Sequence, residues 1–226
     1  MDSESRTVTE FTQLTLRDPD DELELLEAVI QYLEEQDEWV RRHQPARLMY
    51  TDDSFSSIHI DKTTNDTPTV LIIASWDSIQ AHQKWLNSQS HQSLHREVSK
   101  YVSGKRQSMS TRHLRAAGMR NELPSCMRQQ GRFTVGIFHV ERESMEHLQS
   151  RYDRIEKELH GQGLRGCIWA AWELGKNPQQ GELVVFWDQS VPSKYTNQVL
   201  AFSEQKTVHH YRYPGHDSFS SGSSHP

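Results

Sequence analysis

The chain has 226 residues, of which 34% are hydrophobic and 25% charged, and its mean hydropathy is −0.81. Its six tryptophans, seven tyrosines and seven phenylalanines are typical of a folded chain rather than a disordered one. No apolar run reaches the length of a membrane helix, and the N-terminal residues lack the basic and apolar regions of a secretory signal. The two cysteines exclude a disulfide framework and an all-cysteine zinc site. We therefore expect a cytoplasmic protein without a membrane partner.

The charge is distributed unevenly along the chain. Residues 1–60 hold 15 acidic and 5 basic side chains, whereas residues 94–132 hold 9 basic and 2 acidic ones. Two interpretations are open: the basic segment lies beside an acidic helix of the same molecule, or it forms a rim that attracts an anionic substrate. The formal net charge of −6 gives no support for nucleic-acid binding. Residues 161–166, GQGLRG, do not complete a dinucleotide-binding loop, so no nucleotide cofactor is predicted.

The first half of the chain predicts four strands and two helical regions. Alternating apolar residues indicate strands, and the Asp18-Pro19 pair followed by acidic residues indicates a helix start. The predicted elements are, in chain order, a strand at 7–16, a helix from 18 to about 42, β-type residues at 46–61 around a turn at 52–54, a strand at 69–76, a helical region at 78–102 broken near 88–90, and a strand at 108–114.

The second half predicts the same order of elements. They are a strand at 132–140, an amphipathic helix from 145 to 161, strands at 164–174 and 182–187 around a turn at 175–178, a weaker helix at 191–204, and a strand at 208–213. The Ser/Gly/His-rich tail at 215–226 is predicted to be disordered.

Both halves therefore predict the order β–α–β–β–α–β, which is typical of a ferredoxin-like antiparallel sheet with both helices on one face. A buried strand ends in Trp-Asp in each half, at Trp76-Asp77 and at Trp187-Asp188. We predict an α+β fold in which two ferredoxin-like repeats close into an intrachain pseudo-dimeric α/β barrel. The predicted boundaries are 1–118 for the first repeat, 119–131 for a linker and 132–214 for the second repeat.

The segment SWDSIQAHQKWLNSQSHQSL at 75–94 resembles the second helix of the dimeric α/β-barrel superfamily. That superfamily includes antibiotic-biosynthesis-type monooxygenases, stress-response A/B barrel proteins and small polyketide cyclases. Its members have an aromatic residue at the strand end, a Ser-rich helix start and a histidine after a short break, and His91 takes that histidine's position. Tandem copies with a serine-rich tail are most similar to fungal members. The second half departs from the pattern, because residues 192–204 contain no histidine, and it is interpreted as degenerate.

The resemblance implies that His91 is a general base or proton shuttle in an apolar cavity; the alternative is a surface or capping histidine. His59 shares one strand face with Ser57 and Asp61, so it contacts the substrate only if that face lines the barrel. Either His59 or Tyr50 is the candidate partner for a substrate oxyanion. His59 is also the second candidate catalytic residue.

The remaining candidate substrate contacts are aromatic or histidine side chains: Trp76, His82, Trp85, His139 and Trp169. For each, an ordinary core or surface role is the alternative, and His139 alternates with apolar residues on its strand. His91 and His95 have a metal-chelating spacing, but no third ligand is evident, so neither a metal nor another cofactor is predicted.

Two function classes follow. The first is a cofactor-independent tailoring enzyme, a monooxygenase or a cyclase/isomerase, that deprotonates a small aromatic or polyketide-like substrate. The second is a non-catalytic stress-response or small-ligand-binding barrel, and a haem-degrading member is a weaker idea. An open pocket containing a histidine favours the enzyme, and a filled interior favours the binding protein. The sequence is compatible with a homodimer of the whole chain.

Overall fold

A computed structural model describes residues 7–44, 55–61, 67–105, 108–128, 131–174 and 180–214. The described residues do not include the predicted turns at 52–54 and 175–178, Tyr50 or the serine-rich tail at 215–226. Elements of the first half are β1 (Val8–Thr15), the short 3₁₀ helix η1 (Pro19–Asp21), α1 (Glu22–His43), β2 (Ser56–Asp61), β3 (Thr69–Trp76), α2 (Ile79–Leu86), α3 (Gln89–Val98) and β4 (Met109–Ala116). Elements of the second half are α4 (Ser125–Arg128), β5 (Arg132–Glu141), the 3₁₀ turn η3 (Arg142–Ser144), α5 (Met145–Gly161), β6 (Ile168–Glu173), β7 (Gln180–Asp188), α6 (Ser193–Leu200) and β8 (Lys206–Arg212).

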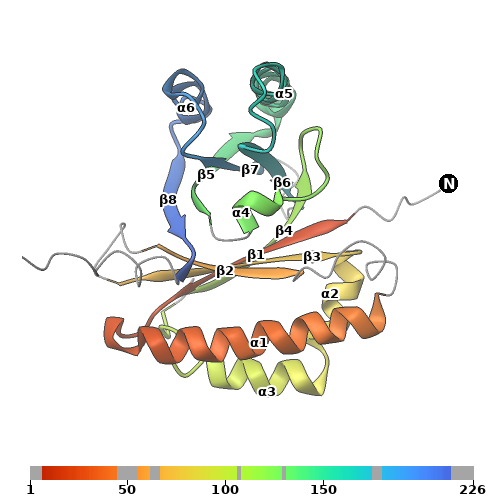
Figure 1. The fold of residues 1–226 in the computed structure, drawn as a ribbon, viewed down its shortest axis with the longest axis vertical. Helices are drawn as coiled ribbons and strands as arrows, with labels where there is room; N and C mark the ends of the chain where they lie inside the picture. The colour runs from red at the N-terminus through yellow and green to blue at the C-terminus, as the bar shows by residue number, and fades with distance from the viewer. Residues whose placement is uncertain are drawn as a thin grey trace, which may run out of the picture.

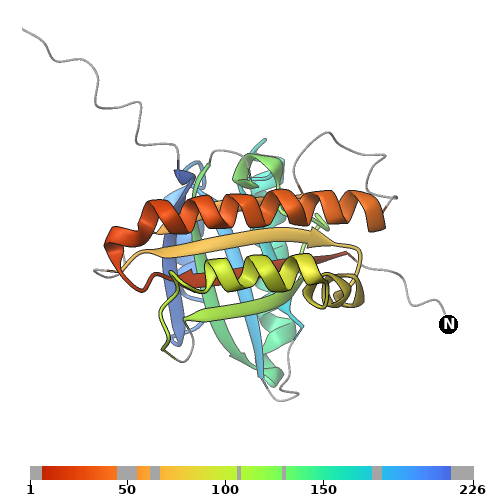
Figure 2. The same ribbon diagram turned by 90° about the horizontal axis from the view of Figure 1, so that it is seen from below.

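The eight strands form a closed antiparallel barrel in the order β1-β3-β2-β8-β5-β7-β6-β4. Each half contributes four neighbouring strands, and the halves join where β2 pairs with β8 and where β4 pairs with β6. Figure 1 shows α1, α2 and α3 on one side of the barrel and α5 and α6 on the other. Seen from below, α1 and α3 lie side by side across the strands of the first half (Figure 2). The predicted α+β class and barrel closure are thus observed.

Successive side chains along each strand point alternately into the barrel interior and toward the helices. Phe11, Leu71 and Ile73 of the first half enter the interior and share one apolar cluster with Phe133 and Phe186 of the second half. The alternate residues of β1 and β3 pack against α1 and α3 in a separate core. The second half has its own core beneath α5 and α6. The molecule therefore has three apolar layers, of which the central one belongs to both halves.

The helices begin where the sequence indicates. The Asp18 side chain accepts a hydrogen bond from the backbone N of Asp20, and Pro19 follows it, so a 3₁₀ turn leads into α1. The predicted break in the second helical region is confirmed: α2 ends at Leu86, and Ser88 caps the start of α3. None of the described helices has the length and apolar character needed to cross a membrane.

Two predicted elements differ from the structure. The strand expected from residue 164 begins only at Ile168, because Gly163 and Gly166 adopt φ of 81° in a turn before it. The segment expected to be only a linker contains the four-residue helix α4, and Leu123 and Met127 join the barrel's interior cluster. The connection between the halves is thus part of the core.

Candidate functional site

A cavity of about 120 Å³ lies in the first half, between the helix-facing side of the sheet and the helices α1 and α3. Strands β1, β3 and β4 form its floor, and α1, the end of α2 and α3 form its walls. Its lining residues are Glu10, Thr12, Leu14, Tyr32, Ile72, Leu86, His91, His95, Val98, Met109 and Thr111. This is a little smaller than the roughly 150 Å³ of an apolar cavity that binds benzene, so the cavity encloses at most one small ring. Of the residues predicted as site residues, His91 lines it.

The position of His91 follows from the start of α3. The Ser88 hydroxyl accepts a hydrogen bond from the backbone N of His91 at 3.1 Å, which fixes the first turn of the helix. The half-buried imidazole meets Tyr32 and Trp85 edge-on, with ring centroids 5.7 and 5.6 Å away, and stacks on His95 at 5.5 Å. Its Nδ1 atom is buried, and no described group completes a hydrogen bond of normal geometry with it.

Burial lowers the pKa of His91 below its ordinary value of 6.5, and the neighbouring His95 and His82 lower it further. The charge of Glu10 and the backbone of Leu86 act in the opposite direction. Because the net shift is downward, the imidazole is neutral near pH 7 and able to accept a proton.

Tyr32 reaches the same cavity from α1. Its hydroxyl accepts a hydrogen bond from Trp85 Nε1 at 3.2 Å, and among the described residues no acceptor is found for its own hydrogen. Burial raises the pKa of the Tyr32 hydroxyl far above its ordinary value, and the charge of Glu10 adds to the effect. Tyr32 therefore stays protonated and can donate a hydrogen bond to an oxygen in the cavity.

Glu10 is a buried carboxylate in the cavity wall, with 3% of its surface exposed. Its Oε2 accepts a hydrogen bond from Trp76 Nε1 at 2.9 Å, and its Oε1 accepts one from the Thr12 hydroxyl at 2.8 Å. The Thr12 hydroxyl in turn lies 2.9 Å from that of Thr111, which also lines the cavity. A buried carboxylate needs such partners, because desolvation of an unpaired charge is costly.

His82, Trp76 and Trp85 support the cavity from behind. All three are fully buried, and the His82 ring stacks on Trp76 with centroids 4.6 Å apart. The His82 Nε2 atom lies 3.4 Å from Glu10 Oε2, and its Nδ1 atom lies 2.8 Å from His113 Nε2. The three residues were predicted to contact the substrate, but they lie behind the residues that line the cavity.

The structure separates His59 and Trp169 from His91, because both point into the barrel interior. His59 is fully buried on β2, with its Nε2 3.1 Å from the Ser57 hydroxyl and its ring edge-on to Phe133 at 4.7 Å. Burial lowers its pKa from 6.5 to about 3. Trp169 is likewise fully buried and donates a hydrogen bond to the Arg120 carbonyl. The sheet therefore stands between these two side chains and the cavity.

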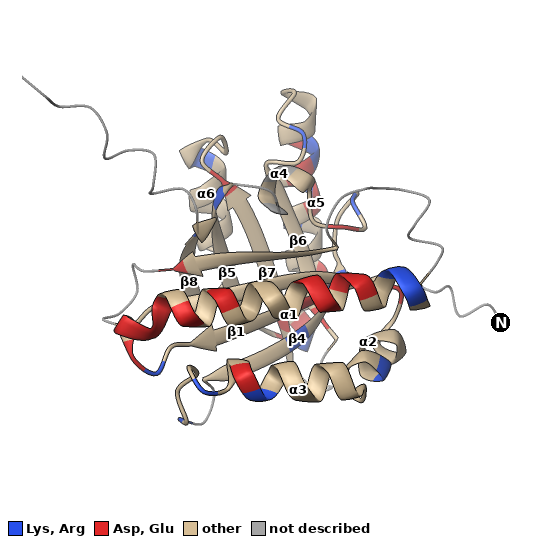
Figure 3. Ribbon diagram, turned by 60° about the horizontal axis from the view of Figure 1, so that its bottom comes forward, with Lys and Arg blue, Asp and Glu red and all other residues tan. Residues whose placement is uncertain are grey.

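His139 also lies away from the cavity. Although it alternates with interior residues on β5, it is exposed near the strand end and lies 3.0 Å from Glu182. Glu182 accepts a hydrogen bond from Arg112 at 2.8 Å. Burial alone would raise the pKa of Glu182, but Arg112 holds it below its ordinary value. One cation of the basic segment is thus paired within the molecule, while the acidic residues of α1 lie along that helix in Figure 3.

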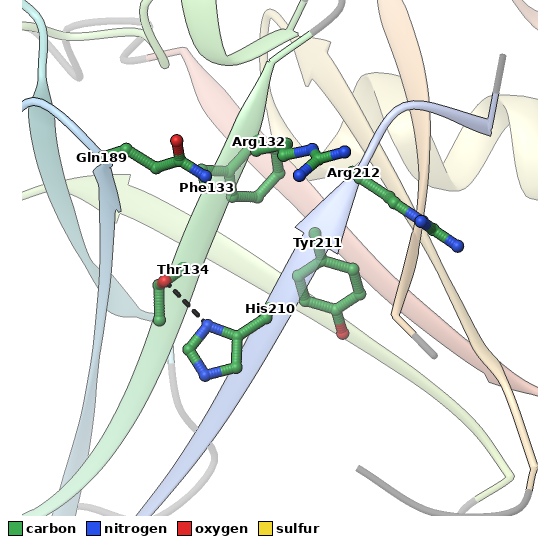
Figure 4. A pocket seen from close by; sticks show the side chains of 7 residues that line it. All are labelled: Arg132, Phe133, Thr134, Gln189, His210, Tyr211 and Arg212. Carbon is green, nitrogen blue, oxygen red and sulfur yellow. Dashed lines mark hydrogen bonds between the residues drawn. The ribbon is translucent and has the colours of Figure 1, made fainter. Parts of the chain in front are cut away.

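A second hollow of about 290 Å³ lies beside β5 and β8, far along the sheet from His91. Figure 4 shows its lining: Arg132, Phe133, Thr134, Gln189, His210, Tyr211 and Arg212. His210 Nδ1 lies 3.0 Å from the Thr134 hydroxyl, and Tyr211 accepts a hydrogen bond from Gln13. None of the predicted site residues lines it, so the smaller cavity is the better candidate site.

Large side chains fill the core under α5 and α6 in the second half. Phe138, Tyr152, Trp187 and Tyr195 are buried in one cluster there. A Cβ atom at Gly136 would come within 2.6 Å of the Phe138 ring, which shows how closely this layer is packed. Over the described residues no group of three His, Cys, Asp or Glu side chains is arranged to hold a metal ion.

No protein-family model and no curated protein matches the sequence. Solved structures do match the fold. A protein described as a "putative monooxygenase" from Fusobacterium nucleatum superposes with a TM-score of 0.56 at 11% identity, covering 91% of each chain. A protein of the same description from Lactobacillus acidophilus gives 0.53 at 9% identity, covering 91% of this chain and 93% of that one. An anthrone oxidase-like protein gives 0.55 at 11% identity, covering 94% and 93%. The likeness shows the fold.

Sequence reasoning missed Tyr32 and Glu10 as site residues. A signal existed for both. Glu10 alternates with Val8, Thr12 and Leu14 on a strand face that is otherwise apolar or hydroxyl-bearing, and a charge at such a position indicates a buried polar site. Tyr32 lies three residues after Val29 on the buried face of α1.

Proposed function

We propose that the chain is a monooxygenase-like enzyme that uses the cavity beside His91 to deprotonate a small aromatic or polyketide-like substrate without a cofactor. The observation that carries the proposal is the pairing, in one cavity, of a neutral His91 with a protonated Tyr32. The solved structures of like fold include proteins described as monooxygenases and as anthrone oxidase-like, which supports this reaction class. We assign the chain to the antibiotic-biosynthesis-monooxygenase type of the dimeric α/β barrels, with its halves as two ferredoxin-like repeats.

In the proposed reaction, His91 takes a proton from a methylene carbon that is next to a carbonyl group or conjugated with one through an aromatic ring. The electron pair moves toward the carbonyl oxygen, where the Tyr32 O–H donates a hydrogen bond to the developing oxyanion. Dioxygen then adds to the carbon, and the proton held by His91 passes to the resulting peroxide. Loss of water leaves a carbonyl group in place of the methylene, so one substrate and one O₂ give one oxidised product and one H₂O.

The size of the cavity limits the substrate. A volume of about 120 Å³ accepts at most one ring, so a polycyclic substrate would extend out of the cavity. The apolar lining from Leu14, Ile72 and Val98 favours a flat, weakly polar ring.

Replacement of the base tests the proposal. We expect His91→Ala to lower turnover by about 10²–10⁴-fold, the usual cost of losing a general base. Turnover is measured as oxygen uptake and product formation with phenylacetone, 2-tetralone and anthrone, each of which carries a weakly acidic methylene group activated by a carbonyl. His147→Ala, at an exposed position on α5, is the matched control and keeps full turnover. Full turnover of His91→Ala would exclude His91 as the base.

The same measurement separates the reaction classes. One O₂ consumed for each product formed supports oxygenation. Product formation without oxygen uptake favours the cyclase/isomerase alternative, in which the same enolate attacks a second carbonyl or is protonated elsewhere. Ligand binding without turnover of any of the three compounds favours the small-ligand-binding barrel. The histidine in an open cavity supports the enzyme over the binding barrel.

A further inference from the structure

A chain of three ionisable side chains leads from the cavity wall toward the protein surface. Glu10 is opposite His113 in the pairing of β1 with β4, and His82 of α2 lies between the two side chains. Its two ring nitrogens face different partners: Nδ1 is within hydrogen-bond distance of His113 Nε2 at 2.8 Å, whereas Nε2 approaches Glu10 Oε2 to 3.4 Å without completing a hydrogen bond. His113 is half-buried, whereas His82 is fully buried. The chain thus connects the cavity with a group that reaches solvent.

We propose that Glu10, His82 and His113 form a proton relay that exchanges protons between solvent and the cavity while a substrate fills it. This inference rests on the proposed function, and it assigns Glu10 as the group that meets the substrate. His82 and His113 act through Glu10.

The proton balance of the relay is fixed by the tautomers. His113 takes up a proton from outside the cavity, and the proton on its Nε2 passes to Nδ1 of His82. The proton on Nε2 of His82 then passes to Glu10, which delivers it to the outer peroxide oxygen as water leaves and takes up the remaining proton of the oxidised carbon. That proton returns to solvent along the same path in reverse, so one proton enters and one leaves, no electron moves, and both imidazoles regain their starting tautomers.

The surroundings hold this geometry in place. The Trp76 ring stacks on His82 with an interplanar angle of 20°, which orients the imidazole plane, and the same Trp76 donates its indole N–H to Glu10 Oε2. The Thr12 hydroxyl holds the other carboxylate oxygen. A buried acid and a buried imidazole are costly compared with apolar side chains of the same size. Their position beside a cavity, rather than in the packed core, is the second argument for a proton-transfer role.

The histidine pair can be tested without any substrate. In ¹⁵N-labelled protein, the 2.8 Å contact predicts a nitrogen–nitrogen coupling across the hydrogen bond between His82 Nδ1 and His113 Nε2. Glu10→Gln keeps an acceptor for Trp76 but removes the carboxylate, so we expect it to shift the ¹⁵N signal of His82 Nε2. His147→Gln is the control and leaves both signals unchanged. Absence of the coupling, or a His82 signal indifferent to Glu10→Gln, would overturn the relay.

The kinetic test uses His113→Ala in the full chain. We expect kcat to fall about 10-fold or more while KM stays within about 2-fold, because the substrate does not touch His113. Added imidazole should restore much of kcat, since it can occupy the vacated space and carry the proton. His113→Gln, which retains a polar group, should be as slow but should not respond to imidazole.

The two tests distinguish a failure of the relay from a failure of the proposed function. If wild-type protein turns over none of the three compounds, the proposed function fails and the relay is judged on the nitrogen signals alone. If wild-type turnover is present, a His113→Ala loss that imidazole does not restore, or a parallel rise in KM, shows a merely structural role and overturns the relay. Circular-dichroism melting confirms that each variant is folded.

Discussion

His59 shows how one buried side chain links the barrel interior to the pH dependence of stability. It is fully buried, and its Nδ1 atom has no hydrogen-bond partner among the described residues. Burial disfavours the charged imidazole, so its folded-state pKa is about 3 against 6.5 for an ordinary histidine. Between these values the unfolded chain binds a proton that the folded chain does not. The contribution of His59 to stability is therefore complete above pH 6.5 and is lost as the pH falls toward 3.

We expect this effect to appear as a slope in the free energy of unfolding. A single such histidine adds about 1.4 kcal/mol of destabilisation for each unit of pH lost in that range. Urea unfolding at pH 7, 6, 5 and 4 measures the slope in the wild type and in His59→Gln, which should lose about that amount of it. His147→Gln, on the exposed face of α5, is the control. Equal slopes for His59→Gln and the wild type would contradict the assignment.

The sequence predicted some of the residues of the candidate site. His91 was identified through the family resemblance of its segment, and the structure places it beside a cavity. The strand face of His59 was left open, because alternation groups residues by face without saying which face meets the helices. Glu10 was missed because it lies on β1, whereas His82 lies on α2 and His113 on β4. These three elements are separate in the sequence and come together only in the folded protein.

The α3 helix depends on a single side-chain cap. Ser88 accepts the hydrogen bond from the His91 backbone N and thereby starts a helix of ten residues. Asn87 closes α2 immediately before it, so the two helices meet at a sharp break. This break turns the first turn of α3, with His91, toward Tyr32.

Removal of the cap should weaken both stability and activity. We expect Ser88→Ala to cost about 1 kcal/mol, as for other serine caps, and to lower the melting temperature by roughly 2–4 °C. Ser93→Ala, at an exposed position inside α3, is the control and should be neutral. Differential scanning calorimetry measures both variants. An unchanged Ser88→Ala melting temperature would show that tertiary packing alone holds α3.

Element prediction succeeded where local chemistry decides the structure. The start of α1, the break at Ser88 and the buried strand β3 follow from a cap, a proline or an apolar run. The errors occur where longer-range packing decides. Ile168 begins β6 only after the turn at Gly163 and Gly166. The predicted linker contains the short helix α4, whose Met127 lies in the interior cluster.

The central apolar layer makes the two halves dependent on each other. Phe11 of β1 meets Phe186 of β7 edge-on, with centroids 5.9 Å apart, and His59 of β2 meets Phe133 of β5. Each half alone would expose this face to water, which costs about 25 cal/mol for each Å² of apolar surface. The closure of one shared barrel follows from covering these faces, and the repeated order of elements was enough to predict it.

We therefore expect residues 1–118 on their own to be unable to remain a folded monomer. The fragment should either self-associate, with a second copy covering the exposed face, or precipitate. Size-exclusion chromatography with light scattering distinguishes these from a monomer, and the full chain is the reference. A monomeric fragment with a cooperative melting transition would show that the halves are independent domains.

The two joints of the barrel are unequal. Over the described residues, β4 and β6 share three residue pairs, whereas β2 and β8 share the single pair Ile60 and Arg212, supported by the contact of Asp61 with His209. Opening the barrel at this joint would break fewer of the described strand pairs than opening it between β4 and β6, and it would leave β2 and β8 as the two edges of the sheet. Such edges present unpaired backbone groups, through which strands of separate molecules join. Of the two joints, we therefore expect the one between β2 and β8 to pair more easily with a strand of another molecule.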